Sequence, residues 1–119
     1  MLFDVVVGQQ ERWATVAVIG EMDLATSPRV RTAVQQVLAT GARSLVLDLG
    51  AVDFIDSTGL GVVLGAVRRV RAADGEIQLV VRQPATLRTF QLTGLDQVLP
   101  IVSSIDDALA ATVPGSTDG

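Results

Sequence analysis

The side chains with the clearest chemical potential stand in one run, Asp56-Ser57-Thr58, shortly after an apolar segment at 45–49. Asp, Ser and Thr are favoured N-caps, so the run can cap a helix that begins there. A hydroxyl at the same place can also accept a phosphate. That would add about −1.5 to −2 charge beside Asp56, near the positive end of the helix dipole. Local chemistry favours capping, and a phosphorylation switch stays open at this point.

Three glycines, Gly59, Gly61 and Gly65, follow this run inside the predicted helix. Each costs about 1 kcal/mol relative to Ala in a helix, so we expect a reason for them. They either allow close packing of the helix on a sheet or leave a bare face for a partner. Their spacing resembles a dinucleotide-binding fingerprint, but they come too far after the strand, and no acidic residue follows the next strand, which ends at Arg82. A nucleotide-binding enzyme is therefore the weakest hypothesis.

Other carboxylates lie near the same run. Asp48 falls inside the predicted strand and Asp53 in the loop that we expect after it. We interpret both, with Asp56, as loop or capping carboxylates, because no second cluster completes a metal or acid–base site. Glu21-Met22-Asp23 also follows a strand, so this acidic loop could share a sheet edge with Asp56 and Ser57.

The composition excludes several classes of chemistry. The chain has no Cys, no His and no Lys, which rules out disulfides, the common zinc sites, His-based triads, the P-loop lysine and Schiff-base chemistry. We therefore expect no cofactor and no metal. The net charge of −4 argues against a nucleic-acid surface. No apolar stretch approaches the roughly 20 residues that cross a bilayer, and the N-terminus does not resemble a signal peptide, so we expect a soluble cytoplasmic protein.

Periodicity places these residues on alternating strands and helices. Strands are predicted at 2–7, 13–19, 45–49, 77–81 and 98–102, with a turn at 8–11 and a loop at 20–25. Helices are predicted from Thr26-Ser27-Pro28, where a hydroxyl cap precedes the proline, to Gly41, and from Ser57 or Thr58 to Ala72. Two more are predicted from Pro84 to Gly94 and from a capping start at Ser104 to Ala111. The pattern predicts one α/β domain over 1–111 with about four helices. Its four- to five-stranded sheet is mostly parallel, the first strand is antiparallel, and a flexible tail follows at 112–119.

The chain resembles a known family in three segments. They are Gly20-Glu21-Met22-Asp23 before a capped helix, the apolar strand 45–49, and Val52 to Gly61, which contains Asp56-Ser57-Thr58-Gly59. Together they are similar to the STAS domain of bacterial anti-anti-sigma factors, also called anti-sigma factor antagonists. The resemblance runs from about Phe3 to Ala111.

This resemblance implies a regulatory protein rather than an enzyme. Ser57 corresponds to the phosphorylation site, with Thr58 as the alternative acceptor, and the implied partner-binding residues also include Asp23, Asp56, Gly59 and Gly61. The unphosphorylated form would bind an anti-sigma factor that is itself a serine kinase and so release a sigma factor. Phosphorylation would end that binding, and a PP2C-type phosphatase would restore it. The alternative is a STAS scaffold or accessory subunit of a signalling or transport complex, without a phospho-switch.

Overall fold

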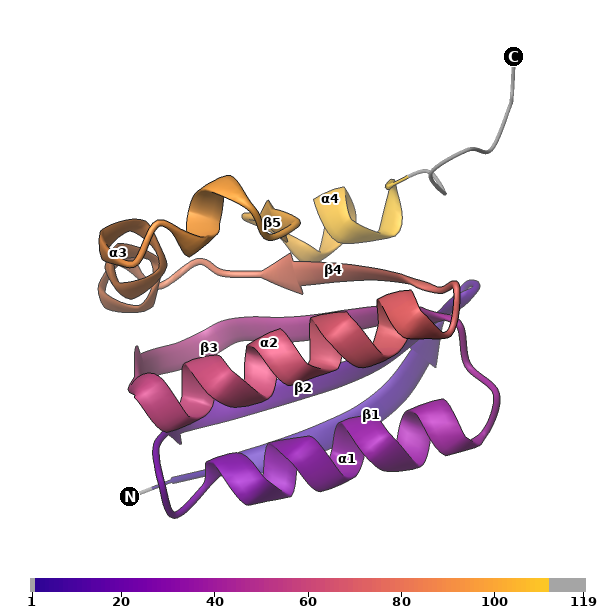
Figure 1. Ribbon diagram of the computed structural model, residues 1–119, viewed down its shortest axis with the longest axis horizontal. Helices are drawn as coiled ribbons and strands as arrows, with labels where there is room; N and C mark the ends of the chain where they lie inside the picture. Colours follow the sequence, from indigo (N-terminus) through magenta and orange to yellow (C-terminus); the bar gives the residue numbers. More distant parts are fainter. Residues whose placement is uncertain (1, 112–119) are drawn as a thin grey trace.

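The computed structural model describes residues 2–111 and begins with an N-terminal hairpin (Figure 1). β1 (Asp4–Gln10) pairs antiparallel with β2 (Trp13–Met22), as predicted. Both strands are longer than predicted, because residues 8–10 and 20–22 continue the pairing and form neither a turn nor a loop. The turn is confined to residues 11 and 12, where Glu11 has a positive φ of 55°. Pairing with neighbouring strands thus outweighs local turn propensity.

A five-stranded sheet in the order β1-β2-β3-β4-β5 confirms the predicted fold class. The remaining strands are β3 (Ser44–Ile55), β4 (Glu76–Val80) and β5 (Ile101–Val102), each parallel to its neighbour. β3 runs to Ile55, so the prediction of a loop around Asp53 is wrong, because β2 continues to pair with β3 up to Met22 and Ile55. β5 is shorter than predicted because Val98 and Leu99 donate their N–H groups to the Leu95 carbonyl and so close a 3₁₀ turn, η1 (Leu95–Gln97).

The helices follow the predicted order. They are α1 (Ser27–Ala39), α2 (Ser57–Ala72), α3 (Pro84–Leu92) and α4 (Ile105–Leu109). Ser104 caps α4 by accepting a 3.1 Å hydrogen bond from Asp107 N–H, as predicted. The predicted hydroxyl cap of α1 is wrong, because Thr26 Oγ1 instead donates to the Glu21 carbonyl at 2.6 Å.

The two faces of the sheet are covered by different helices. α1 and α2 lie side by side on one face (Figure 1), where they bury the main core with Leu45, Leu47 and Leu49 of β3. Val46 points the other way and packs with Trp13 and residues of α4 in a second, smaller core. This alternation is the two-residue period of a strand covered on both faces.

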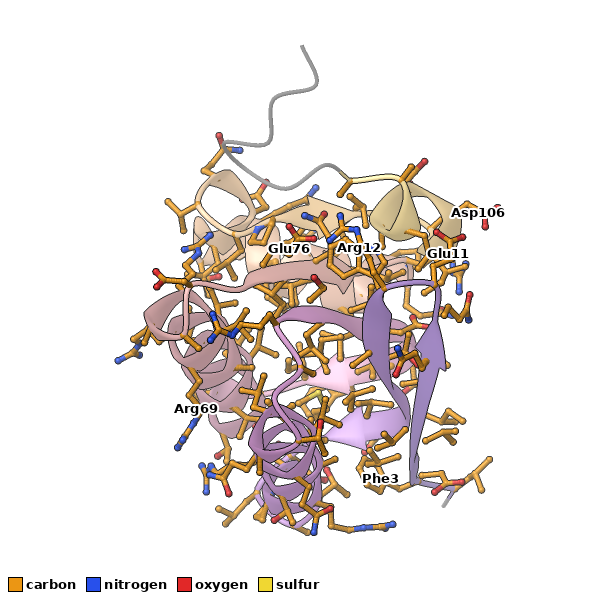
Figure 2. The ribbon with its side chains drawn as sticks, turned by 90° about the vertical axis from the view of Figure 1, so that its right-hand side faces the viewer. Phe3, Glu11, Arg12, Arg69, Glu76 and Asp106 are labelled. Carbon is orange, nitrogen blue, oxygen red and sulfur yellow. The ribbon has the colours of Figure 1, made fainter. Side chains whose placement is uncertain are left out.

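One charged cluster closes the end of the sheet that carries the hairpin turn. Arg12 lies beside Glu76 (Figure 2), forms an ion pair with it and donates to Ser44 Oγ at 3.1 Å and to the Ala111 carbonyl at 2.9 Å. The guanidinium also lies 4.5 Å from the centre of the Trp13 ring. Arg12 therefore connects the hairpin, β3, β4 and the segment after α4.

Helix α3 protects the edge that β3 would otherwise expose. β4 pairs with β3 only as far as Asp48, so the second half of β3 lacks a strand on that side. There the buried Thr86 donates its hydroxyl to the Val52 carbonyl at 2.6 Å, and Gln83 Nε2 donates to the Gly50 carbonyl at 3.3 Å. Side chains of α3 thereby replace part of the missing ladder along the second half of β3.

Two predictions concern the ends and the environment of the chain. The predicted tail at 112–119 lies outside the described residues, and the domain boundary at 111 stays a prediction. Across residues 2–111, no helix combines the length and the apolar character needed to span a membrane.

Candidate functional site

The ends of β2 and β3 bring the two predicted acidic segments together. Met22 pairs with Ile55, and Asp56 N–H donates to the Met22 carbonyl at 3.1 Å. The Glu21-Met22-Asp23 segment and the Asp56-Ser57 segment therefore share one edge of the sheet, as expected from the sequence. Parallel strands deliver their carboxyl ends to the same edge, which is where α/β domains place their sites.

Asp56 is the N-cap of α2. Its backbone is extended, its Oδ1 accepts a 3.0 Å hydrogen bond from Gly59 N–H, and its carbonyl accepts one from Leu60 N–H at 2.9 Å. These bonds satisfy donors that the first turn of a helix leaves open. The capping interpretation is therefore confirmed for Asp56.

Ser57, by contrast, is the first residue of α2 and its side chain is exposed. Within residues 2–111 its hydroxyl makes no hydrogen bond to protein, since Asp56 already caps the helix. The following Thr58 is half-buried. Of the two predicted acceptors, Ser57 is thus the more accessible, and it stands at the positive end of a 16-residue helix.

Asp23 organises the neighbouring loop. Its Oδ1 accepts hydrogen bonds from Ala25 N–H at 2.9 Å and Thr26 N–H at 3.0 Å, and it lies 3.1 Å from Thr26 Oγ1. The Thr26 N–H is the largest cause that lowers the pKa of Asp23 from its ordinary value, against a raising effect of burial. Asp23 thus holds a negative charge and a fixed loop at the entrance to α1.

The glycines of the motif separate into two kinds. A Cβ at Gly59 would lie 2.7 Å from Ile55 Cγ1 and 2.9 Å from Met22 Cβ, so this glycine allows α2 to pack against the ends of β2 and β3. A Cβ at Gly61 or Gly65 would meet nothing within 4 Å. Close packing therefore explains Gly59, and it explains neither Gly61 nor Gly65.

Two exposed apolar side chains at this edge were not predicted. Leu24 is 74% exposed in the loop after β2, and Phe54 is 47% exposed near the end of β3. The sequence held a partial signal, because each of these large apolar residues directly follows an aspartate. The exposure of Phe54 depends on the continuation of β3 as a strand through this residue.

The other carboxylates have local structural roles. Asp48 Oδ1 accepts a 2.8 Å hydrogen bond from Gly50 N–H, and Asp53 is exposed. Within the described part of the chain, no three potential metal ligands gather into a group. The edge of the sheet therefore presents an accessible serine and an acidic, partly apolar surface.

Comparison with known proteins identifies this arrangement. The family model described as STAS domain matches residues 4–108. The chain is also 31% identical over 105 residues to the anti-sigma-F factor antagonist RsfB of Mycobacterium tuberculosis, which covers 88% of this chain and 85% of that protein. The chain belongs to the STAS domain family. The resemblance drawn from the Asp-Ser-Thr-Gly motif is thereby confirmed.

Solved structures of STAS proteins agree with this assignment. The crystal structure of an anti-sigma factor antagonist from Mycobacterium paratuberculosis has a TM-score of 0.85 and 35% identity, with 95% of each chain covered. The phosphorylated form of SpoIIAA, a Bacillus cell fate determinant, has a TM-score of 0.68 at 23% identity and covers 89% of this chain and 96% of that one. The second likeness extends to the fold alone.

Proposed function

We propose that the chain is an anti-sigma factor antagonist switched by phosphorylation of Ser57. Its unphosphorylated form binds an anti-sigma factor that is a serine kinase, in the cytoplasm, and thereby frees a sigma factor. The single observation that carries this proposal is the exposed Ser57 hydroxyl, free of hydrogen bonds to described residues, on a helix that its neighbour Asp56 already caps.

A phosphate on Ser57 is compatible with the fold. The cap of α2 does not use the serine hydroxyl, so its modification removes no bond that holds the helix. The helix dipole favours a negative charge at this end. SpoIIAA, which shares the fold, is known in a phosphorylated form, and this supports the compatibility of the fold with phosphate.

The same phosphate is well placed to oppose binding. It adds about two charges and three oxygens to a surface that already carries Asp23, Asp53 and Asp56. A partner that fits the neutral hydroxyl loses its fit and meets a more strongly negative surface. An interface penalty of about 3 kcal/mol weakens binding on the order of 150-fold.

The antagonist relatives support the identity of the partner. RsfB is named for opposing an anti-sigma-F factor, and a Listeria monocytogenes relative, 35% identical over 86 residues, for opposing an anti-sigma-B factor. In this cycle the protein is a substrate of the kinase and not a catalyst. A PP2C-type phosphatase returns Ser57 to its binding form.

The test uses the purified full chain with each anti-sigma factor kinase of its host, also purified. Binding is measured by calorimetry before and after incubation with ATP, and the phosphorylated residue is mapped by mass spectrometry. We expect one kinase to bind, phosphate to appear on Ser57, and binding to fall with it. Ser57→Ala should stay bound in ATP, and Ser57→Asp should bind at least about 100-fold more weakly.

Ser103→Asp is the matched control, because Ser103 is an exposed serine that follows β5, two strands away from β3 in the sheet. It should bind as the unmodified chain does. Phosphate on Thr58 would move the acceptor by one residue. Equal binding by Ser57→Asp and the unmodified chain, with no phosphate on either residue, would replace the switch with a scaffold function.

A further inference from the structure

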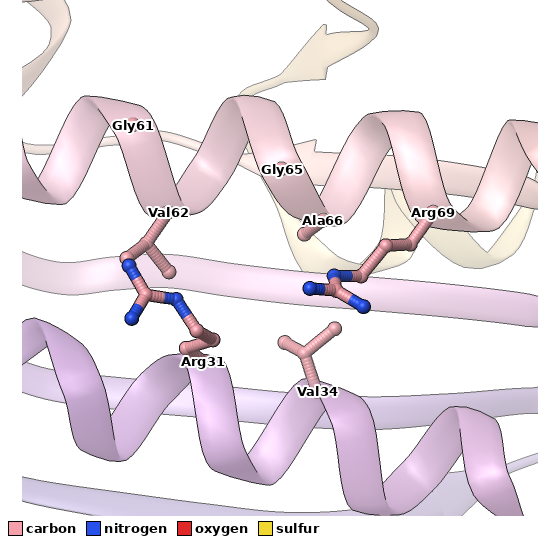
Figure 3. A pocket seen from close by; sticks show the side chains of 7 residues that line it. All are labelled: Arg31, Val34, Gly61, Val62, Gly65, Ala66 and Arg69. Atoms are coloured by element: carbon pink, nitrogen blue, oxygen red, sulfur yellow. The ribbon is translucent and has the colours of Figure 1, made fainter.

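A groove runs between the two helices that cover the main core. It has a volume of about 50 Å³ (Figure 3). Its lining comes from α1 and α2 only and comprises Arg31, Val34, Gly61, Val62, Gly65, Ala66 and Arg69. The groove therefore lies along the same helix that begins at Ser57.

Two glycines on the α2 side of this groove have no explanation inside the protein. Neither Gly61 nor Gly65 has an atom within 4 Å of the place where a Cβ would stand. Each costs about 1 kcal/mol of helix stability relative to Ala. Without side chains at these positions, another chain can approach the backbone of α2 more closely. Contact with a partner would therefore account for both glycines.

Two arginines from opposite helices reach into the groove at different places along it (Figure 3). Arg31 reaches from α1 towards Val62, and the guanidinium of Arg69 reaches from α2 over Val34 (Figure 3). No acidic residue lines the groove. In the described part of the chain the only ion pair is between Arg12 and Glu76, so neither groove arginine is neutralised there.

The dimensions of the groove restrict what can occupy it. A volume of about 50 Å³ is far below the 300–1,000 Å³ of typical small-molecule sites, so it suits one or two side chains rather than a nucleotide. Guanidinium groups bind carboxylates through paired hydrogen bonds. Charge complementarity therefore favours a protein segment that carries Asp or Glu.

We infer that this groove is a second docking site for the anti-sigma factor, occupied by a carboxylate-bearing segment of that partner. The inference rests on the proposed function. At 1.5 Å rise per residue, Gly61 lies about 6 Å and Gly65 about 12 Å along α2 from Ser57, so one partner can cover both places. The arginines attract the acidic segment, while Ser57 decides whether the complex persists.

The test measures binding of the kinase partner found with the full chain, in low and high salt. The double charge reversal Arg31→Glu and Arg69→Glu should weaken binding roughly 30-fold or more, mainly in low salt. Arg68→Glu together with Arg71→Glu makes the same charge change at two exposed positions of α2 outside the groove. This control should change binding less than about fivefold.

Substitution of the two glycines provides an independent test. Gly61→Ala and Gly65→Ala should each raise the melting temperature of the free chain, because Ala favours the helix and the added Cβ meets open space. The pair should also weaken partner binding about 10-fold, because the methyl groups hold the partner away from α2. A glycine needed only for folding would lower the melting temperature instead.

The outcomes separate this inference from the proposed function. If the double reversal and the glycine pair bind like the unmodified chain while Ser57→Asp does not, the switch stands and the groove assignment is wrong. If no anti-sigma factor kinase binds the unmodified chain, both fail together. If the double reversal in the groove weakens binding and the control with Arg68→Glu and Arg71→Glu does not, the groove is the docking site.

Discussion

At the scale of single residues, the helix cap and the candidate phosphate acceptor are two adjacent residues, Asp56 and Ser57. Asp56 commits its carboxylate to Gly59 N–H and holds the start of α2, whereas the hydroxyl of Ser57 points to solvent without a bond to described residues. The capping and phosphorylation interpretations of this run therefore do not compete. The proposed modification of Ser57 is compatible with the cap of α2, because Asp56 provides that cap.

Asp23 makes a pH-dependent contribution to stability. Hydrogen bonds lower the pKa of Asp23 in the folded state, and the bond from Thr26 N–H has the largest effect. The folded chain thus binds this proton less readily than the unfolded chain. The resulting stabilisation is fully present above the unfolded pKa of about 3.9 and is lost as the pH falls through the lower folded value.

Asp23→Asn tests this, because the amide oxygen still accepts hydrogen bonds but cannot be protonated. We expect the unmodified chain to exceed the variant in free energy of unfolding at pH 7, and this difference to shrink as the pH falls below about 4. Urea unfolding at a series of pH values measures it. An NMR titration of the Asp23 carboxyl, folded and in urea, is the control. Equal pKa values in the two states would contradict the prediction.

At the scale of elements, three features of the candidate site lie along the single helix α2. Its first residue is the candidate acceptor, Gly59 fits it against β2 and β3, and Gly61 and Gly65 leave its groove side bare. Fixing the start of α2 against the ends of two strands determines where all three lie. The helix therefore joins the proposed phosphorylation site to the proposed docking groove.

Helix α3 stabilises β3, the strand that ends just before Ser57. Thr86→Val keeps the shape of the buried side chain but removes its hydrogen bond to the Val52 carbonyl. We expect a loss of about 1–3 kcal/mol in the free energy of unfolding, because the buried carbonyl loses a donor. Chemical denaturation measures this. Thr32→Val removes an exposed hydroxyl that bonds to Pro28 in α1 and should change stability by less than about 0.5 kcal/mol. Equal losses of stability in Thr86→Val and Thr32→Val would contradict the protection of the β3 edge by α3.

At the scale of the whole molecule, Arg12 connects parts of the chain that lie far apart in sequence. It lies beside Glu76 (Figure 2) and pairs with it, it donates to Ser44 and to the carbonyl of Ala111, and it stacks on Trp13. The Glu76 side chain is 7% exposed and that of Arg12 is 42% exposed. The buried carboxylate therefore depends on a cation that solvent partly screens.

Arg12→Leu should lower the free energy of unfolding by up to about 3 kcal/mol, because it leaves the Glu76 carboxylate buried without its cation. The double variant Arg12→Leu with Glu76→Leu should recover much of this loss, since it removes both charges. Urea unfolding followed by the fluorescence of Trp13, the single tryptophan, measures both. A double variant that loses the sum of the separate effects of Arg12→Leu and Glu76→Leu would show that the pair is not coupled.

Much of the fold was predictable because its signals are local. Alternating and continuous apolar runs indicated the strands, and Pro28, Pro84 and Gly41 placed the helix ends near where they are. Strand lengths were not predictable. β2 and β3 continue because they pair with each other past their apolar segments, and α3 supplies bonds to the exposed edge, which depend on residues more than thirty positions away.

The order of strands and helices was enough to predict the fold class, because capping and helix periodicity act between near neighbours. The candidate acceptor came from the family resemblance that the motif from Asp56 to Gly61 carries. Sequence could not assign the cap to Asp56 and leave Ser57 free, nor distinguish Gly59 from Gly61 and Gly65. Those differences depend on which atoms surround each residue: Met22 and Ile55 fill the space at Gly59, and the gap between α1 and α2 leaves it open at the other two glycines. Such surroundings come from chain segments that meet only when the domain is packed.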